Sequence, residues 1–337
     1  MGICHGIADA TAGFLLGSLV QTNSLEQTSL LIIIYNILGF GYQPVAGMFT
    51  DKFNCPRQAI ILGLFLLLGS LIVADWHSQP AVILAGIGSA AFHVGGGSLA
   101  LSTTPNRTTG PGIFAAPGVV GLAVGVALGL KDYSFTMPLI LSLGFMIALL
   151  TVVKLPKLSN INVNELELPI SAEYDWVMLV LMSGIALVST VWTSFQFLLQ
   201  AQLTFLIVIA VAAAVAKILG GIMAEYWGWQ RWTITSLTVA TILLLWGQEN
   251  PLTLILSLAL LQSTVPITLT ATGRMMPNQP ATAAGFALGL AIIIGSIPVV
   301  AGLNIVAENP AIAALVVLAT ILSLGWVFQL KTFRRKY

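Results

Sequence analysis

The chain alternates between long apolar runs and short polar breaks that contain charged residues, proline or glycine. A helix that crosses a bilayer needs about 20 mostly apolar residues, and runs of that order follow one another along the sequence. The pattern predicts twelve such helices, at residues 3–20, 28–49, 57–74, 80–103, 110–130, 134–153, 176–196, 201–224, 231–247, 251–274, 281–303 and 309–330.

The longest polar break lies between the sixth and seventh predicted helices. It runs from Lys154 to Asp175, contains the acidic residues Glu165, Glu167 and Glu173, and is too polar to cross a membrane. We therefore predict an all-α membrane protein of two six-helix bundles, residues 1–153 and 176–337, joined by a cytoplasmic linker at 154–175. The first apolar run is interpreted as a retained span and not as a cleaved signal peptide.

Composition agrees with this pattern. Of the 337 residues, 57% are hydrophobic and 7% charged, and the mean hydropathy is +0.97. Ordinary soluble domains carry about 25% charged residues, so the composition excludes a water-soluble enzyme and predicts a lipid bilayer as the surroundings. A net charge of +1 gives no general attraction for nucleic acid. No metal-ligand spacing is present, and Cys4 and Cys55 are not expected to form a disulfide.

The basic residues predict the orientation in the membrane, because cytoplasmic loops carry the excess of Lys and Arg. With the N-terminus inside, one basic residue, Lys131, falls outside. Both termini are therefore predicted to be cytoplasmic, in a multi-pass cell (inner or plasma) membrane. Eleven basic residues fall on the cytoplasmic side, namely Lys52, Arg57, Arg107, Lys154, Lys157, Arg231, Arg274, Lys331, Arg334, Arg335 and Lys336.

A polar motif occurs twice, which indicates an internal repeat. GMFTDKFNCPR starts at Gly47, and GIMAEYWGWQR starts at Gly221, 174 residues later. In this alignment Asp51 corresponds to Glu225, and Arg57 to Arg231. A second pair, PNRTTGPGIFA from Pro105 and PNQPATAAGFA from Pro277, is separated by 172 residues.

This duplicated motif resembles the loop between the second and third helices of major facilitator superfamily transporters. The resemblance implies two related bundles, a binding site near mid-membrane, transport by alternating access, and a monomer without cofactors. It also implies a gating role for the two loops, whose charges would favour an outward-facing state. Solvated loops that merely carry charge are the alternative. The gating residues implied are Gly47, Asp51, Arg57, Gly221, Glu225 and Arg231.

Four ionisable residues lie within predicted spans, where a charge costs at least about 2.5–3.5 kcal/mol and needs a partner, a cavity or a function. His5 and Asp9 are four residues apart and share one helix face. His93 follows in a glycine-rich helix, and Lys217 lies in the eighth. We predict that Asp9 exchanges a proton. The alternatives are a static pair of Asp9 with Lys217 or His5, and a His93 that only packs.

Neutral polar residues on other helices predict the remaining lining of a solute cavity. Hydroxyl groups at most of these positions would equally serve helix packing. Lys217 would favour an anionic solute and Asp9 a cationic one, so the predicted cargo is a small organic solute without an assigned charge. The residues predicted to line the cavity, besides the four ionisable ones, are Tyr35, Asn36, Gln43, Trp192 and Gln262.

The fifth predicted helix carries Pro117 and glycines at 118, 121, 125 and 129, whose spacing of four predicts a smooth ridge for close helix contact. Together with HGIADATAGF from His5 and GIGSAAFHVGGGS from Gly86, this helix resembles the fosmidomycin-resistance exporters. That resemblance implies efflux. The sequence thus predicts a non-enzymatic, proton-coupled exporter, with a transport-inactive assembly or accessory protein of the same fold as the alternative.

Overall fold

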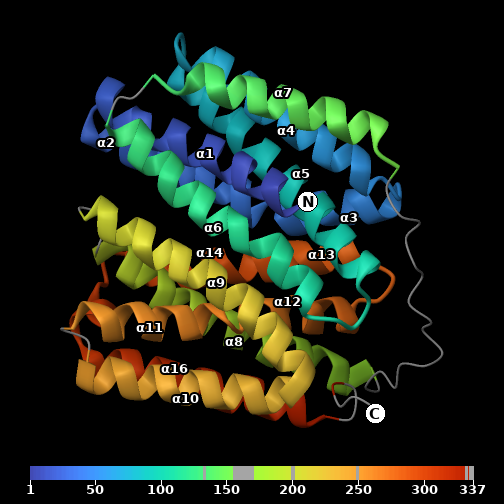
Figure 1. Ribbon diagram of the computed structural model, residues 1–337, viewed down its shortest axis with the longest axis vertical. Coiled ribbons are helices and arrows are strands. Elements are labelled where there is room, and N and C mark those ends of the chain that lie inside the picture. Colours follow the sequence, from blue (N-terminus) through green and yellow to red (C-terminus); the bar gives the residue numbers. More distant parts are fainter. Residues whose placement is uncertain (132–133, 155–170, 199–201, 248–249, 331–332, 334–337) are drawn as a thin grey trace. The chain divides into compact units, whose positions relative to one another are not determined.

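The computed structural model describes residues 1–131, 134–154, 171–198, 202–247, 250–330 and 333, and it is helical throughout that part of the chain, without a strand. Figure 1 shows the helices in sequence colours. The elements are α1 Gly2–Thr22, α2 Leu25–Asn36, η1 Ile37–Gly41, α3 Gln43–Lys52, α4 Pro56–Ala74, α5 Ser78–Thr103, α6 Thr109–Leu130, α7 Thr136–Val152, α8 Ser171–Leu198, α9 Leu203–Trp227, α10 Trp229–Gly247, α11 Pro251–Gln262, α12 Val265–Met275, α13 Pro280–Gly285, η3 Phe286–Leu290, α14 Ala291–Val300, α15 Ile305–Glu308 and α16 Pro310–Gln329.

The predicted all-α membrane fold is confirmed. Among the described residues, ten helices are long and apolar enough to cross a membrane, and α7 and α10 are the shorter or less apolar helices at the two remaining predicted positions. Three predicted helices are interrupted in the structure: the second by the π-helical turn η1, the tenth between α11 and α12, and the eleventh by η3. Such π-helical turns insert a residue into a helix and are frequent at functional sites.

Local sequence explains several helix starts. Ser24 and Gln27 form a capping box, so α2 begins at Leu25, before the predicted start at 28. Asn250 and Asn309 accept backbone N–H groups at the starts of α11 and α16. α8 begins at Ser171, within the predicted linker, whose remaining residues 155–170 lie outside the described part of the chain.

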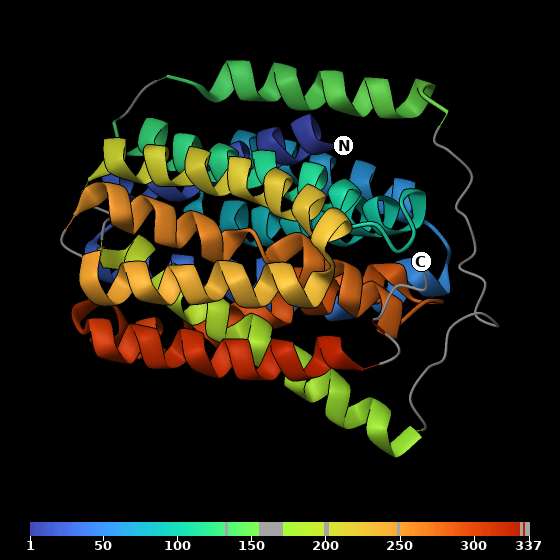
Figure 2. The ribbon, with the colours of Figure 1, turned by 60° about the horizontal axis from the view of Figure 1, so that its bottom comes forward.

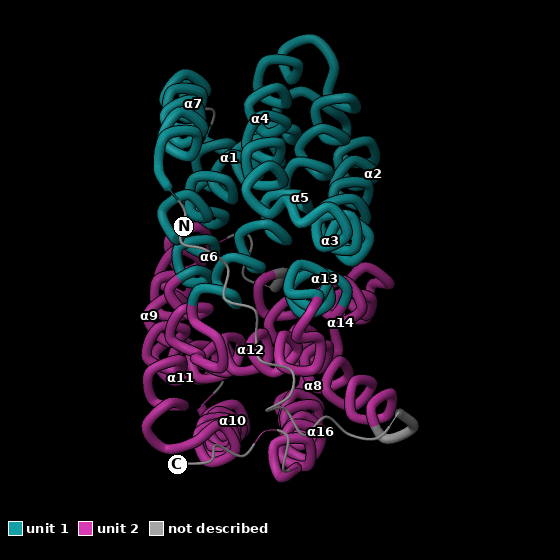
Figure 3. Tube along the Cα trace, turned by 90° about the vertical axis from the view of Figure 1, so that its right-hand side faces the viewer, with its two compact units in different colours: residues 1–103, 114–159, 279–290 teal, residues 104–113, 160–278, 291–337 magenta. Residues whose placement is uncertain are grey.

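The helices form two compact units, coloured separately in Figure 3. Unit 1 comprises residues 1–103, 114–159 and 279–290, and unit 2 comprises residues 104–113, 160–278 and 291–337. Each unit thus includes a short segment from the other sequence half, where the repeated PN motifs lead into a helix. The division into two bundles at the linker, at residues 1–153 and 176–337, stays a prediction.

Helix α5 forms the core of unit 1. Nearly every side chain from Ala85 to Ser102 on this helix is buried, and it packs against α1, α2, α4 and α13. Its approach to α4 is close because Gly63 faces Gly88: a methyl group at Gly63 would lie 2.6 Å from the Gly88 carbonyl oxygen. The outer helices α4 and α7 lie side by side and expose large apolar side chains, as expected of surfaces that face lipid (Figure 1).

In unit 2, α8 packs against α14 and α16, and α10 against α11 and α16. Figure 2 shows α10 and α16 side by side. The indole of Trp229 at the start of α10 packs edge-to-face on Phe328 at the end of α16, with ring centroids 6.1 Å apart. This aromatic contact fixes the adjacent ends of the two helices.

Candidate functional site: a buried His–Asp–His cluster and two carboxylate caps

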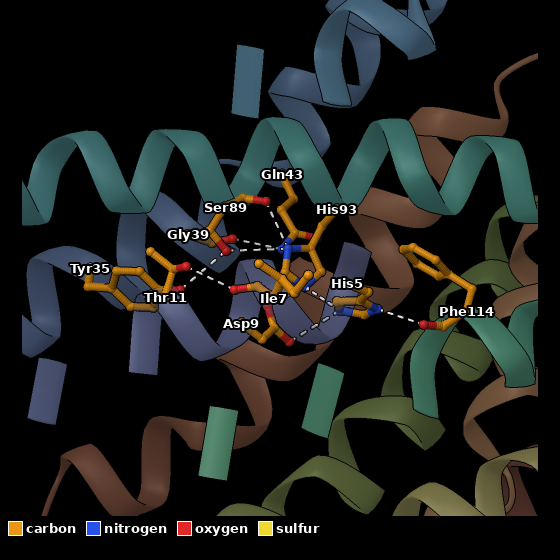
Figure 4. A network of polar contacts seen from close by, with 10 residues as sticks. All are labelled: His5, Ile7, Asp9, Thr11, Tyr35, Gly39, Gln43, Ser89, His93 and Phe114. Carbon is orange, nitrogen blue, oxygen red and sulfur yellow. Dashed lines mark hydrogen bonds and ion pairs between the residues drawn. The ribbon is translucent and has the colours of Figure 1, made fainter. Parts of the chain in front are cut away.

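Helices α1 and α5 of unit 1 bring together the three ionisable residues predicted in the first sequence half. His5 and Asp9 are one helical turn apart on α1, and His93 reaches them from the centre of α5 (Figure 4). Only 4% of His5 and 6% of His93 is exposed, and 15% of the Asp9 side chain. Of the four residues predicted, these three form one cluster.

The contacts within the cluster are short. His5 Nε2 lies 3.0 Å from His93 Nε2 and 3.2 Å from Asp9 Oδ2, and His93 Nε2 lies 3.5 Å from Asp9 Oδ1. Two imidazoles and one carboxylate therefore point their polar atoms at one small volume. The rings of His5 and His93 meet edge-on, with an interplanar angle of 89°.

Backbone carbonyl groups orient both imidazoles. His5 donates its Nδ1–H to the Phe114 carbonyl oxygen of α6 at 2.8 Å, and His93 donates its Nδ1–H to the Ser89 carbonyl oxygen at 2.8 Å. A carbonyl oxygen can only accept a hydrogen bond, so these contacts fix which ring nitrogen carries the proton. The Phe114 ring also stacks on His5, with centroids 4.5 Å apart.

The glycine ridge of α6 makes room for this cluster. The prediction of close contact is confirmed: a methyl group at Gly121 would collide with the Gly6 carbonyl of α1, and one at Gly125 with that of Ala10. Gly118 lies over the cluster itself, where an added methyl group would lie 2.5 Å from His5 Nε2 and 2.7 Å from Asp9 Oδ2. Gly118 is thus a site residue because any larger side chain would displace the two polar groups.

The predicted polar residues of the second span surround the cluster to different degrees. Tyr35 is buried and donates its hydroxyl proton to Ser89 Oγ at 3.2 Å, which links it to the His93 side of the cluster. Gln43 is buried and donates its amide N–H to the Gly39 carbonyl, within the π-helical turn, at 2.7 Å; its Oε1 has no protein partner. Asn36 is half-buried directly before that turn.

The repeated loops make a second kind of contact. In unit 1, Asp51 at the end of α3 accepts the backbone N–H groups of Ala281 at 3.0 Å and Thr282 at 2.7 Å, together with the Thr282 hydroxyl at 2.7 Å. These groups are the unpaired donors at the N-terminus of α13, where a negative charge is stabilised by the helix dipole. The carboxylate of Asp51 is therefore a helix cap.

Glu225 makes the equivalent contact in unit 2. Its Oε1 accepts the backbone N–H of Thr109, at the start of α6, at 2.9 Å, while the Thr108 hydroxyl donates to the Gly221 carbonyl at 2.6 Å. The two caps follow the repeat: Glu225 is Asp51 plus 174, and Ala281 is Thr109 plus 172. Each motif loop thus caps the helix that follows the PN motif of the other repeat.

The glycines of the motif permit these contacts. A methyl group at Gly47 would lie 2.5 Å from the Ala281 carbonyl oxygen, and one at Gly221 would lie 2.7 Å from that of Thr108. In both units, therefore, the backbone of the motif loop packs directly against the backbone at the start of the capped helix.

Several solved structures have a similar arrangement of helices, and the three named here are transporters. The human organic anion transporter MFSD10 aligns with a TM-score of 0.70 and 15% identity, over 96% of this chain and 97% of its own. The E. coli fucose:proton symporter FucP gives 0.67 and 12%, over 97% and 95%. A bacterial homologue of the iron transporter ferroportin gives 0.62 and 12%, over 97% and 98%. The chain has the major facilitator fold.

At these identities the likeness concerns the fold. No protein-family profile matches the sequence, and the comparison with curated proteins gives no match. The predicted twelve-helix arrangement of the major facilitator fold is confirmed, while the resemblance to fosmidomycin-resistance exporters stays a prediction.

Within the major facilitator fold, the other predicted site residues lie in unit 2. Lys217 is on α9, one turn before Gly221; Trp192 is half-buried on α8, and Gln262 is buried at the end of α11. Their contribution to a common solute site, including a pair between Asp9 and Lys217, stays a prediction.

The basic residues of the two motif loops differ in their surroundings. Arg57 donates from Nη2 to the Leu150 carbonyl near the end of α7, in unit 1. Arg231 is exposed and lines a surface hollow of about 700 Å³ together with Tyr226, Trp227 and Gln230. In both loops the acidic residue accepts backbone N–H groups at the start of a helix, so a helix terminus contributes to holding each loop.

Sequence reasoning missed several residues that shape the site. Ser89 and Phe114 orient the histidines through backbone oxygens, and Thr282 adds a hydroxyl to the Asp51 cap. A carbonyl has no sequence signature. Gly118 was recognised as part of a glycine-rich helix, but its place over the cluster depends on the register between α1 and α6.

Proposed function

We propose that the protein is a secondary active transporter that exports a small organic solute by alternating access, driven by proton uptake at His5, Asp9 and His93. The observation that carries the proposal is the cluster itself. Inside a membrane helix bundle, a side-chain nitrogen or oxygen of each of these three residues lies within 3.5 Å of one on each of the other two. Such groups are expensive to bury in a membrane protein and typically mark ion or proton pathways.

A proton fits this cluster better than a metal ion. The ligand atoms of the three residues all lie within 4.8 Å of one another, which satisfies the distance requirement for a metal. Two neutral imidazoles and one carboxylate would leave a divalent ion with an excess positive charge in apolar surroundings, whereas one added proton makes the cluster neutral. The cluster is therefore assigned to the proton.

The two carboxylate caps support alternating access. A charge at a helix N-terminus contributes about 0.3–1 kcal/mol, and up to about 2 kcal/mol where it is partly buried. Asp51 and Glu225 are both half-buried, so the two caps together stabilise the packed arrangement of the motif loops by a few kcal/mol at most. That amount suits a state that must form and release in each cycle. With the motif loops on the cytoplasmic side, the packed arrangement corresponds to the outward-facing state.

The proposed chemical nature of the solute is based on the polar residues predicted to line the cavity. The proposal assigns solute contacts to Tyr35, Asn36 and Gln43 in unit 1, and to Lys217, Trp192 and Gln262 in unit 2. Gln43 Oε1 is a buried acceptor without a protein partner, which suits a hydroxyl or amide donor on the cargo. Two similar folds carry small solutes, fucose with protons and organic anions, as their names state. The proposed direction of transport, export, and the proposed monomeric state are what the family resemblances of the sequence imply.

Transport by purified protein in liposomes tests the proposal. A pH gradient should drive flux of a solute identified by a thermal-shift screen, and Asp9→Asn should lower the proton-driven rate by at least about tenfold. Asp75→Asn is the matched control, because Asp75 is exposed in the turn after α4. Proton-driven flux at the wild-type rate in Asp9→Asn would exclude a coupling role for this carboxylate.

A transport-inactive accessory protein is the second candidate, and the short connections favour it: only residues 75–77 separate α4 from α5, and Gly228 alone separates α9 from α10. Such a protein would co-purify with a stable partner and give no flux in the same liposomes. Flux that depends on the pH gradient would exclude it.

A further inference from the structure

The contact between the two imidazoles has a consequence for where the proton resides. Both Nδ1 atoms already donate to carbonyl oxygens, from His5 to Phe114 and from His93 to Ser89. A neutral imidazole carries one N–H, so in the neutral form each Nε2 presents a lone pair. Two lone pairs that face each other at 3.0 Å repel, and the arrangement needs a hydrogen between them.

We infer that His5 and His93 bind one exchangeable proton between their Nε2 atoms, as an imidazolium–imidazole pair, with the Asp9 carboxylate as its counter-charge. One proton enters and one N–H bond forms; no other bond changes. The role of this proton in transport rests on the proposed function. The inference places the coupling proton on the histidine pair and not on the carboxyl group of Asp9.

The number of protons follows from the same geometry. With no proton on either Nε2, two lone pairs face each other at 3.0 Å and repel. With a proton on each Nε2, two N–H groups face each other at the same distance and also repel. Only the singly protonated pair makes an N–H···N hydrogen bond, so the two rings hold one proton between them. Asp9 lies 3.2 Å from one Nε2 and 3.5 Å from the other, and it balances the charge wherever the proton lies.

Protonating Asp9 in place of the pair would not remove the repulsion. A neutral Asp9 could donate its proton to the Nε2 of one histidine. The Nε2 lone pair of the second histidine would still face the first Nε2 at 3.0 Å, with no hydrogen between the two nitrogens. The carboxyl proton would also have to choose between two imidazoles that are both stronger bases than a carboxylate. The proton therefore belongs between the rings.

Other titratable groups around the pair are few. Tyr35 on α2 bonds to Ser89, which also contacts His93, and Cys4 precedes His5 on α1. Helices α6 and α7 and the segment 280–290 contribute no titratable side chain. Those of α3 and α4 lie at the helix ends, Asp51, Lys52 and Arg57; Tyr42 precedes α3, and Glu26 is in the first turn of α2. The amino group of Met1 lies one turn before His5. Asp9 is a charged side chain in direct contact with both rings.

Loss of the proton should loosen the contact between α1 and α5, because the repelling lone pairs must separate or admit water. This links protonation to helix packing inside unit 1, and supplies the state-dependent proton affinity that coupling requires.

Nitrogen magnetic resonance of the full chain in lipid nanodiscs tests the inference, because the sequence contains only three histidines. With ¹⁵N-labelled histidine near neutral pH, we expect both Nδ1 atoms of the pair to be protonated and one proton to couple both Nε2 atoms. His93→Gln and His5→Gln should each abolish that coupling, since an amide can donate to the remaining Nε2. His77→Gln is the matched control, since His77 is exposed.

Two further measurements use the same samples. The midpoint of thermal unfolding should fall as the pH is raised through loss of the proton in the wild type, but not in His93→Gln. Asp9→Asn should weaken proton binding by at least about tenfold, because an opposite charge within hydrogen-bond distance is removed. Independent titration of His5 and His93, a proton missing from either Nδ1, or a stoichiometric metal that remains after chelation would each overturn the inference.

The outcomes separate this inference from the proposed function. A shared proton without solute flux would retain the histidine pair and reject the transporter. Proton-driven flux together with independently titrating histidines would retain the transporter and reject the pair.

Discussion

The carboxylate caps occur in both units, whereas the histidine cluster belongs to unit 1. The positions of α8 that correspond to His5 and Asp9, at an offset of 172–174, carry apolar residues or Ser183, whose hydroxyl bonds to its own helix at Leu179. The repeat has kept the contacts that hold the motif loops in both units and placed the histidine cluster in one. Under the proposed function, this difference would mean that closing uses two matched contacts and that proton binding uses one site.

The largest expected effect comes from filling the space that α6 leaves for the cluster. In Gly118→Ala, the new methyl group would lie 2.5 Å from His5 Nε2, so the histidine pair must move. We expect a loss of about 1–3 kcal/mol of stability from overpacking and at least about a tenfold fall in proton-driven transport. Gly144→Ala, with nothing within 4 Å, is the control. Wild-type transport in Gly118→Ala would show that the cluster geometry does not matter.

Removing one cap should be next in size. Asp51→Asn and Glu225→Gln each keep the shape of the side chain but remove its charge from a helix N-terminus. We expect each to weaken the packed arrangement by about 1–2 kcal/mol, and to raise the accessibility of cysteine probes placed beside residues 281 and 109. Equal effects would support matched roles for the two loops. If only one variant changes accessibility, the symmetry of the caps has no functional meaning.

The motif glycines should give a similar but smaller effect. Gly47→Ala places a methyl group 2.5 Å from the Ala281 carbonyl oxygen, and Gly221→Ala places one 2.7 Å from that of Thr108. The loop and the capped helix must then separate by about half an ångström or more, which lengthens the hydrogen bonds to the carboxylate. We expect a fall in transport of a few-fold, greater for Gly47→Ala. Gly69→Ala, whose nearest atom is 4.0 Å away, should be neutral.

The smallest effect should come from the periphery of the histidine cluster. Tyr35→Phe removes the hydrogen bond to Ser89 Oγ but leaves the Ser89 carbonyl in place for His93. We expect a loss of stability of about 0.5–1.5 kcal/mol and little change in proton coupling. Denaturation and liposome flux measured on the same preparation check both. A loss of coupling as large as that in Gly118→Ala would mean that Tyr35 takes part in proton transfer.

Hydropathy was sufficient to predict the twelve helices, because a span must be apolar over most of its length regardless of its neighbours. The starts of helices were less well predicted where a polar cap precedes the hydrophobic run. Ser24 and Gln27 form a capping box that moves the start of α2 to Leu25, and this signal was present in the sequence. The π-helical turn at Ile37–Gly41 carries no such signal, because its cause lies in packing.

The site was predictable residue by residue but not as a set of contacts. His5, Asp9 and His93 stood out because ionisable groups are rare in membrane spans. That His5 and His93 meet, although 88 residues apart, depends on how α1 and α5 pack. The motif carboxylates were predicted to gate, but their partners include backbone N–H groups, which every residue except proline provides. The repeat offsets of 174 and 172 residues match Asp51 with Glu225 and Thr109 with Ala281, so they relate the two caps to each other but predict neither cap alone.

The crossed pattern of the caps has the form of a two-fold symmetric interface. Asp51 of the first repeat caps the helix that follows the PN motif of the second, and Glu225 of the second caps the helix that follows the PN motif of the first. In a two-fold symmetric dimer, a contact from residue i of one subunit to residue j of the other is always repeated in the opposite direction, from residue i of the second subunit to residue j of the first. A single ancestral repeat would therefore satisfy both contacts by pairing with its own copy. Gene fusion would then have freed one copy to acquire histidines without disturbing the interface.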